Sequence, residues 1–212
     1  RRAWRRAKSI VVISDGLRRE LVALGVPEQK ILLARDAVDM EKFYITANRD
    51  ECRAKLNLPA DKKIAVYTGH LYDWKGADVL ARAAAELPSG TLIYIVGGTP
   101  ADTDAFERKF ASANLHVLGW RSSSEVPLWL KAADVLVLPT SGKTAIGARY
   151  TSPMKLFEYM ASGTPIVASD LPSIREVLNE SQAVFVCPDD PLALAGGIAA
   201  VLHNEHAAHR IA

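Results

Sequence analysis

The residues of this chain that could do chemistry gather in the segment Tyr150–Asp170, which is YTSPMKLFEYMASGTPIVASD. Ser152 and Pro153 are typical of a helix start, as the N-cap and a residue of the first turn. In the helix that follows, Lys155 and Glu158 are three residues apart, so the ammonium and the carboxylate share one face. Backbone N–H groups at a helix start, with a cation and a carboxylate, suit a ligand that carries phosphates and a ribose. A surface Lys–Glu pair on an ordinary helix is the alternative that this segment alone leaves open.

The elements that must position these residues alternate regularly between apolar strands and helices. The pattern predicts strands at residues 9–13, 31–34, 64–67, 91–96, 115–118, 135–138, 166–168 and 183–186. It predicts helices at residues 15–24, 50–56, 76–87, 103–112, 125–133, 153–162, 171–178 and 191–203. Continuous apolar strands that alternate with helices form a parallel sheet covered on both faces. The predicted fold class is therefore α/β, with a Rossmann-like doubly wound parallel sheet in a single domain over residues 1–212.

Ligands of doubly wound sheets bind outside the carboxyl ends of the strands, where the connecting loops meet. In this chain the predicted strands end at glycine-rich or polar turns, namely Gly69-His70, Gly97-Gly98, Gly119-Trp120 and Pro139-Thr140-Ser141. We expect these turns to converge on one crevice beside the start of the helix at Ser152. A glycine at a strand end also makes an ordinary tight turn, and that alternative stays open for each turn taken alone.

Composition limits the class of protein. The chain has 212 residues, of which 49% are hydrophobic, enough for one ordinary domain or a large piece of a two-domain protein. A formal net charge of +2 gives no indication of a nucleic-acid partner. Cys52 and Cys187 lack metal-ligand spacing, so we expect free thiols in a reducing compartment, with a disulfide as the open alternative. No apolar run approaches the ~18 residues of a spanning helix and no signal peptide is visible, so we expect a soluble, cytoplasmic protein.

The first eight residues, RRAWRRAK, combine five cations with one tryptophan. We expect this segment to be the last turns of a helix. A surface that contacts anionic lipid at the inner face of a membrane is the functional alternative, because clustered Lys and Arg beside a Trp favour that interface.

Several stretches, in the same order along the chain, resemble the group 1 (family 4) glycosyltransferases, a large group of retaining enzymes with the GT-B fold. The element Gly69-His70-Leu71 followed by Lys75-Gly76 resembles the family's G-R-L-x-x-x-K-G. The segment Lys155–Asp170 resembles its L-L-E-A-M-A-x-G-T-P-V-V-A-S-D. Further likenesses lie at residues 7–14, 36–43, 117–120, 133–140 and 175–177. The resemblance covers nearly the whole chain, and its collinear order makes it more specific than any single element.

The resemblance implies that the chain is the C-terminal, donor-binding half of a GT-B enzyme, with the N-terminal acceptor domain absent. Lys75 matches the cation that holds the diphosphate of a nucleotide-sugar, where it would stabilise the charge that builds on the leaving group. Glu158 matches the second glutamate of the family's E-x7-E element, which accepts hydrogen bonds from the ribose hydroxyls. These two are the predicted catalytic residues. The predicted donor-binding residues are Gly69, His70, Lys75, Gly119, Trp120, Tyr150, Thr151, Ser152, Pro153, Met154, Lys155 and Glu158.

Two positions depart from the family's pattern. His70 stands where the family usually has arginine, and Tyr150 stands where the first glutamate of E-x7-E is expected. That glutamate normally lies by the transferred sugar, so the departure leaves open how the sugar is recognised. The Ser-Pro-Met-Lys sequence fits a branch of the family in which Lys155 assists the phosphates.

The predicted ligand is a nucleotide-sugar donor, bound without a metal ion or other cofactor. Asp102-Thr103-Asp104 is a D-x-D, which binds manganese in the other glycosyltransferase fold, but here we expect it to cap a helix. His203, His206 and His209 have no carboxylate or cysteine set that completes a metal site.

The expected function is transfer of a glycosyl group, with retention of configuration, to a glycan, lipid or small acceptor. We expect the isolated chain to bind the donor and to transfer poorly, because the chemistry takes place between two domains. Two other functions stay open: a GT-B-like nucleotide-sugar 2-epimerase, and a non-catalytic nucleotide-sugar-binding domain that has lost its site. Lys75 and Glu158 as solvated surface charges, and Trp120 as a core residue, are the remaining alternatives for single residues.

Overall fold

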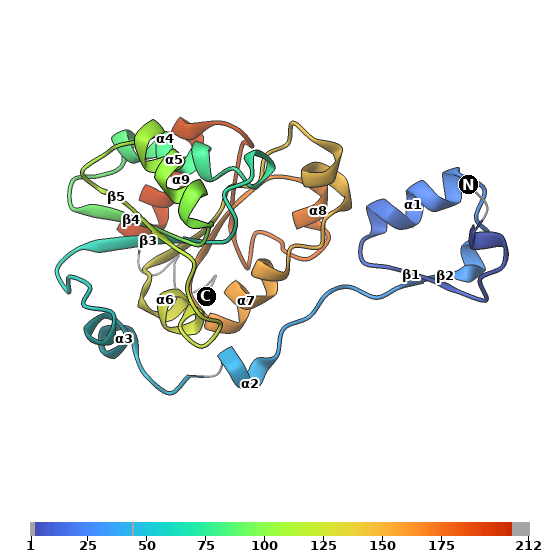
Figure 1. Ribbon diagram of the computed structural model, residues 1–212, viewed down its shortest axis with the longest axis horizontal. Coiled ribbons are helices and arrows are strands. Elements are labelled where there is room, and N and C mark those ends of the chain that lie inside the picture. Colours follow the sequence, from blue (N-terminus) through green and yellow to red (C-terminus); the bar gives the residue numbers. More distant parts are fainter. Residues whose placement is uncertain (1–2, 44, 205–212) are drawn as a thin grey trace.

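The computed structural model describes residues 3–43 and 45–204, and its centre is a six-stranded parallel sheet (Figure 1). The strands lie in the order β5-β4-β3-β6-β7-β8. Their bounds are β3 Lys63–Thr68, β4 Thr91–Val96, β5 Leu115–Gly119, β6 Val135–Leu138, β7 Ile166–Ser169 and β8 Val184–Val186. The chain winds outward from β3 in one direction and from β6 in the other. This order confirms the Rossmann-like α/β prediction and places a topological switch point between β3 and β6.

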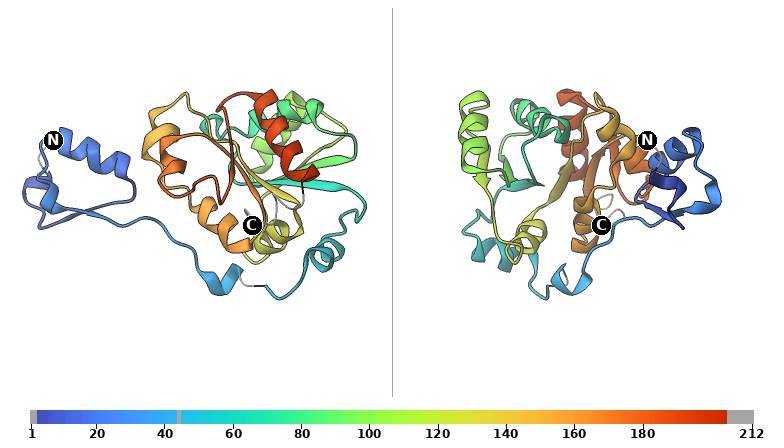
Figure 2. Two further views of the ribbon diagram at one scale, coloured as in Figure 1. Left: turned by 180° about the vertical axis from the view of Figure 1, so that it is seen from behind. Right: turned by 45° about the vertical axis from the view of Figure 1, so that its right-hand side comes forward.

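Helices cover both faces of this sheet, as expected for parallel strands that are buried on both sides. The helices are α3 Arg49–Lys55, α4 Ala77–Ala83, α5 Pro100–Lys109, α6 Val126–Ala132, α7 Met154–Ser162, α8 Pro172–Arg175 and α9 Pro191–His203. The short turns are η3 Asp73–Lys75 and η4 Ala84–Glu86, which are 3-10 helical, and η5 Ile146–Tyr150, which is π-helical. Helices α4, α5 and α9 lie on one face, and α6 and α7 lie on the other (Figure 1, Figure 2).

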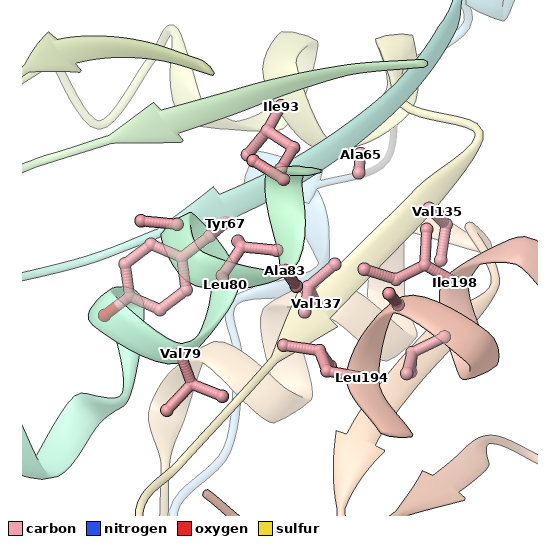
Figure 3. Close-up of a cluster of buried hydrophobic side chains, with 14 of the residues drawn as sticks. Ala65, Tyr67, Val79, Leu80, Ala83, Ile93, Val135, Val137, Leu194 and Ile198 are labelled. Atoms are coloured by element: carbon pink, nitrogen blue, oxygen red, sulfur yellow. The ribbon is translucent and has the colours of Figure 1, made fainter. Parts of the chain in front are cut away.

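Alternate positions along the strands supply two hydrophobic cores, one on each face of the sheet. The first joins strand residues to α4 and α9 and includes Ala65, Tyr67, Ile93, Val135, Val137, Leu80, Leu194 and Ile198 (Figure 3). The second joins strand residues to α6 and α7 and includes Ile64, Val66, Leu136, Ile166, Leu130, Leu156 and Tyr159. Burial of each large apolar side chain stabilises the fold by roughly 1.5–3 kcal/mol. The sheet and its helices therefore form a rigid frame for the loops at the strand ends.

The first two strands form a separate parallel sheet of two strands. The elements of this part are η1 Ala3–Arg5, β1 Ile10–Val12, α1 Asp15–Ala23, η2 Glu28–Lys30, β2 Ile31–Leu33 and the following helix α2 Met40–Phe43. The β1–α1–β2 unit lies to one side of the main sheet and joins it through an extended segment (Figure 1, Figure 2). Val11 and Leu32, one on each strand, are 61% and 58% exposed. The single domain expected over residues 1–212 stays a prediction, and the structure adds that, within residues 3–43 and 45–204, β1 and β2 pair only with each other.

Helix α3 is held against the main sheet by a buried arginine. The Arg53 guanidinium is 3% exposed and donates hydrogen bonds to the backbone oxygens of Ala60, Lys62 and Ala132. It also donates to the Asp134 carboxylate across 2.6 Å. That carboxylate accepts two more hydrogen bonds, from the Ile64 backbone N–H at 2.7 Å and from Arg49 at 2.8 Å. The network ties α3 to the starts of β3 and β6.

Most predicted elements agree with the structure within one or two residues, and three differ more. Helix α5 begins at Pro100 rather than near residue 103, because Thr99 and Asp102 form a capping box before it. The D-x-D segment lies inside α5, and Thr99 is the N-cap, so the prediction that the segment caps the helix holds only for Asp102. From the third helical position Asp102 completes the capping box and accepts hydrogen bonds from the backbone N–H and the hydroxyl of Thr99. The helix expected at 171–178 shortens to α8, and the one expected at 76–87 divides into α4 and η4.

Candidate functional site

Three glycine turns meet at the carboxyl ends of β3, β4 and β5. The Gly69 N–H donates to the Val96 backbone oxygen across 2.8 Å, and the Gly97 N–H donates to the Gly119 backbone oxygen across 2.8 Å. A Cβ atom on Gly97 would lie 2.2 Å from the Gly69 backbone oxygen, so only glycine permits this approach. The three glycines have φ values of +143°, +133° and +69°, which also favour glycine. The structure brings these turns together, as expected.

The Lys155 side chain lies across the end of β3. A Cβ atom on Gly69 would lie 2.0 Å from Lys155 Cε and 2.3 Å from Lys155 Nζ, so the amine group occupies the space that this glycine leaves open. Burial lowers the pKa of Lys155, and the charge of Glu158 opposes that shift. Burial raises the pKa of Glu158, and the charge of Lys155 opposes that shift in turn. Lys155 and Glu158 thus share one half-buried face of α7, as their spacing predicts.

Lys75, the last residue of η3, lies near enough to Lys155 to be affected by its charge. Gly76 follows it with a φ of +74°, and a Cβ atom there would lie 1.8 Å from the backbone oxygen of Pro139. The η3 turn therefore packs directly on the end of β6, across the switch point from β3. Burial lowers the pKa of Lys75 to about 8, and the charge of Lys155 adds to the shift.

Two half-buried ammonium groups, on Lys75 and Lys155, are thus close enough for the charge of one to lower the pKa of the other. Burial removes part of the hydration of each cation, and their like charges repel. An anion with two linked negative groups would relieve this repulsion and replace the lost hydration. The arrangement is therefore suited to a diphosphate.

The start of α7, which carries Lys155, offers backbone donors. The helix begins at Met154, with Pro153 in the extended N-cap conformation and no side-chain cap. The prediction that Ser152 caps this helix is wrong, because Pro153 takes that place and the Ser152 hydroxyl accepts instead from the Asp36 N–H across 3.4 Å. Thr151 closes the preceding turn η5 through its backbone N–H. Since no side chain caps α7, its first N–H groups are available to an anionic ligand.

His70 is exposed and contacts a neighbouring aromatic ring. Its ring stacks on Tyr72, with the ring centroids 5.0 Å apart, and its backbone oxygen accepts from the Tyr67 hydroxyl across 2.8 Å. Tyr72 borders a surface hollow of about 150 Å³ between η3 and α5, which includes none of the predicted site residues. The charge that acts on Lys75 is that of Lys155, on α7.

Tyr150 contacts the β1–α1–β2 unit. Its hydroxyl donates to Glu20 across 3.2 Å, and its backbone oxygen accepts from the Ser14 hydroxyl across 3.4 Å. A Cβ atom on Gly16 would lie 1.9 Å from the Arg149 backbone oxygen, so α1 packs directly on η5. Single π-helical turns are rare in proteins, and those that occur are often found at functional sites. The Tyr150 hydroxyl is thus engaged with α1, at the position where the resembled motif has a glutamate.

Glu176 makes a contact that the sequence did not predict. Its carboxylate accepts from the Asp15 N–H at 2.7 Å and from the Gly16 N–H at 3.0 Å, at the start of α1. A carboxylate there is stabilised by the helix dipole. Arg35 lies 3.7 Å from the same carboxylate. Glu176 falls within a segment that resembles the family, but only the folded chain brings it to the N-terminus of α1.

Trp120 directly follows β5 and is exposed to solvent. The residue is 72% exposed, so the alternative that it belongs to the core is wrong. Gly119 precedes it in the left-handed conformation, and the Arg121 guanidinium donates to the Leu118 backbone oxygen across 2.6 Å. These contacts define the turn that carries the indole. An exposed ring beside the glycine turns offers a stacking face to a planar ligand.

The cysteines and histidines form no metal-binding cluster in the part of the chain that the structure describes. No group of three His, Cys, Asp or Glu residues within residues 3–43 and 45–204 could hold a metal ion. His206 and His209 lie outside these residues. Both cysteines are free thiols, with Cys52 buried and Cys187 exposed.

The basic N-terminal segment begins with Arg1 and Arg2, which lie outside the described residues. The expected helix end is a short 3-10 turn, η1, in which the Arg5 guanidinium lies 5.6 Å from the centroid of the Trp4 ring. Contact of this segment with anionic lipid stays a prediction. Among the helices of the described chain, none has the length and apolar character needed to cross a membrane.

Comparison with known proteins places these features in a family context. A sequence model of the family described as "Glycosyl transferases group 1" matches residues 62–204, which contain the whole main sheet. The chain is 31% identical to the phosphatidyl-myo-inositol mannosyltransferase of Mycobacterium tuberculosis, over 92% of this chain and 50% of that protein. It is 28% identical to the D-inositol 3-phosphate glycosyltransferase of Xylanimonas cellulosilytica, over 97% of this chain and 52% of that protein. The chain therefore spans about half the length of these curated relatives.

Solved structures of low sequence identity share the fold. The crystal structure of Anabaena Alr3699/HepE in complex with UDP matches 99% of this chain and 58% of its own, with a TM-score of 0.85 and 17% identity. The C-terminal domain of the glycosyl transferase group 1 family protein LpcC from Francisella tularensis matches 82% of this chain and 92% of its own. Its TM-score is 0.66 at 19% identity.

Proposed function

Since the chain belongs to the group 1 glycosyl transferases, we propose that its crevice between β3 and β6 binds the nucleotide diphosphate of a sugar donor. The observation that carries this proposal is the pair of half-buried lysines, Lys75 and Lys155, beside the uncapped start of α7. Two cations and a set of backbone N–H groups in one place suit two linked phosphates. The likeness of the fold to HepE, whose crystal structure is a complex with UDP, supports a nucleotide ligand.

Each group has its own role in this proposal. Lys75 and Lys155 hold the phosphates, and their charges stabilise the negative charge that builds on the diphosphate as its bond to the sugar breaks. Glu158, on the same face of α7 as Lys155, accepts hydrogen bonds from the ribose hydroxyls. The exposed ring of Trp120 stacks on the base at the end of β5.

We propose that the two lysines balance the charge of the diphosphate without a metal ion. Lys155 supplies the second positive charge, since its amine lies at the end of β3 beside Gly69, whereas the imidazole of His70 is stacked on Tyr72. Gly69 is part of this arrangement, since a side chain at that position would displace the Lys155 amine. Lys155 of α7 thereby supplies the positive charge that arginine would supply at position 70, where this chain has histidine.

The activity of the longer protein is a further part of the proposal. Because the curated relatives are about twice as long as this chain, we propose that a second domain binds a glycan, lipid or small acceptor across the crevice. In that cytoplasmic protein the sugar is transferred with retention of configuration, and this chain alone transfers poorly. NMR of the anomeric centre of the product tests the stereochemistry, and an inverted product would contradict the proposal.

Calorimetric titration of the chain with UDP, GDP and ADP tests the proposed site. We expect one of the three to bind with a stoichiometry of one, because contacts with the base select among them and the ribose and diphosphate are common to all three. Glu158→Ala should weaken that binding about tenfold, the size expected for hydrogen bonds to a charged group. The matched control is Glu107→Ala, on the exposed face of α5, which should leave the affinity unchanged. Failure of all three nucleotides to bind either this chain or the longer protein would contradict the proposal.

A further inference from the structure

Trp74 presents its ring to the amine group of Lys75. Lys75 Nζ is 3.9 Å from the centroid of the Trp74 ring, and both residues are half-buried. A cation at that distance is attracted by the ring, whose quadrupole is negative over its face. Among residues 3–43 and 45–204 no carboxylate forms an ion pair with Lys75, so the indole is the group that holds the ammonium.

The position of the indole is fixed by the backbone of its own turn. The Ser141 N–H donates to the Trp74 backbone oxygen across 3.1 Å. Two residues later, Gly76 packs so closely on the Pro139 backbone oxygen that no side chain fits between them. Both contacts fasten η3 to the loop after β6. The ring and the ammonium are therefore held at the switch point before any ligand arrives.

We infer that Trp74 is a positioning residue of the phosphate site, whose ring holds the Lys75 ammonium in place and leaves its charge available to a diphosphate. A carboxylate could hold the lysine equally well, but it would compete for the cation and repel the phosphates. A ring face carries no net charge, so it avoids both effects. The role toward the diphosphate rests on the proposed function, whereas the contact between ring and ammonium does not.

The surroundings of Lys75 make the contribution of the ring measurable. Lys155, on α7, repels the Lys75 ammonium. Glu158, one turn further along that helix, raises the pKa of Lys155. Burial and this repulsion lower the pKa of Lys75 to about 8, so the charged form is favoured only about tenfold at pH 7. Loss of a group that stabilises the charge should therefore change the titration of this lysine.

The test compares Trp74→Leu with Trp74→Phe in the full chain without nucleotide. Reductive ¹³C-methylation labels the lysine amines and retains their charge, and Lys75→Arg assigns the Lys75 signal in NMR spectra. We expect Trp74→Leu to lower the pKa of Lys75 by about half a unit to one unit, the size of a cation–π contact. Trp74→Phe should retain most of the wild-type value. Trp4→Leu, which removes a ring that faces Arg5, is the matched control and should leave the Lys75 pKa unchanged.

A Lys75 pKa that stays constant or rises in Trp74→Leu overturns the inference, because the ring would then contribute nothing to the charged form. If Trp74→Leu does not fold, 5-fluorotryptophan in the wild-type chain replaces it, since fluorine weakens the negative face with little change in shape. The Lys75 pKa must fall in that protein as well, and a constant value there overturns the inference.

Titration with UDP separates this inference from the proposed function. We expect Trp74→Leu to bind UDP about fivefold more weakly than the wild-type chain at pH 8.5, with a smaller difference at pH 7. Failure of UDP, GDP and ADP alike to bind the wild-type chain would count against the phosphate site, and the nucleotide that does bind replaces UDP in this comparison. The pKa of Lys75 would still decide whether the ring holds the ammonium. A lowered pKa with unchanged UDP affinity at both pH values would overturn the role of Trp74 toward the ligand.

Discussion

Lys75→Ala is expected to lower the affinity of the chain for UDP about 100-fold at pH 7. The Lys75 ammonium is half-buried beside Lys155, so its removal takes a charge-assisted contact from a partly desolvated site. Truncating one partner of such a buried charged contact typically costs about 2–5 kcal/mol, and 100-fold corresponds to ~2.7 kcal/mol. Calorimetric titration of the wild-type chain and the variant under identical salt measures the difference.

Lys109→Ala is the matched control for this substitution. Lys109 also lies near an aromatic ring, with its Nζ 5.1 Å from the Phe110 centroid, but it is exposed on α5 and outside the crevice. Its loss should change the UDP affinity by less than twofold. Equal losses in the two variants would show that net charge, and not the position of Lys75, determines the binding.

The same lysine determines how UDP binding should depend on pH. In the free chain Lys75 has a pKa of about 8, so its ammonium is charged below that pH and neutral above it. Since the diphosphate binds the charged form, the affinity is fully present below pH 8 and falls as the pH rises above it. The range from pH 7 to 9.5 avoids protonation of the terminal phosphate, whose pKa is about 6. Lys75→Arg should remove this step, because a guanidinium stays charged, and a flat wild-type profile would contradict the role of Lys75.

Arg53→Met is expected to destabilise the fold by about 3–5 kcal/mol. Arg53 is buried and its guanidinium donates to three backbone oxygens and to the Asp134 carboxylate. Removing one partner of a buried ion pair leaves an uncompensated charge, which accounts for a cost of this size. The surviving contacts of Asp134 with Ile64 and Arg49 place the expected value near the lower end. Urea denaturation followed by tryptophan fluorescence measures the change in the free energy of unfolding.

Two further variants test the reason for that loss. Arg82→Met removes an exposed arginine that pairs with Asp78 on the same helix, and it should change the free energy of unfolding by less than 0.5 kcal/mol. Arg53→Met combined with Asp134→Leu should recover part of the lost stability, because the buried charge is then absent as well. A cost below about 1 kcal/mol for Arg53→Met alone would show that the network does not hold α3.

Much of the main sheet could be predicted from the sequence because its strands are largely apolar runs, and β3 to β6 end at glycine or proline. The prediction for residues 135–138 matches β6, and those for residues 64–67 and 166–168 lie within one residue of β3 and β7. The meeting of the glycine turns could be predicted for the same reason, since parallel strands end at one edge of a sheet. Lys155 and Glu158 were candidates by residue type and spacing, and Lys75 was a candidate through the resemblance of its segment to the family's motif.

The parts that could not be predicted depend on contacts between distant segments. The pattern of β1 and β2 gives no indication that they pair only with each other, because an apolar run does not identify its neighbour. Ser152 has the residue type of an N-cap, but Pro153 takes that place in the fold. The contacts of Tyr150 with Glu20 and of Glu176 with the start of α1 join residues more than a hundred positions apart.

The contact between α1 and η5 has a mechanical consequence. The β1–α1–β2 unit touches the larger part of the chain through the Glu20–Tyr150 and Gly16–Glu176 hydrogen bonds, and Tyr150 precedes Pro153 at the start of α7 by three residues. The small unit is therefore joined to the short loop that precedes the uncapped start of α7. Gly16 makes this linkage stiff, because a helix without a side chain there rests directly on a backbone oxygen. Any displacement of the unit would reach the start of α7 through η5.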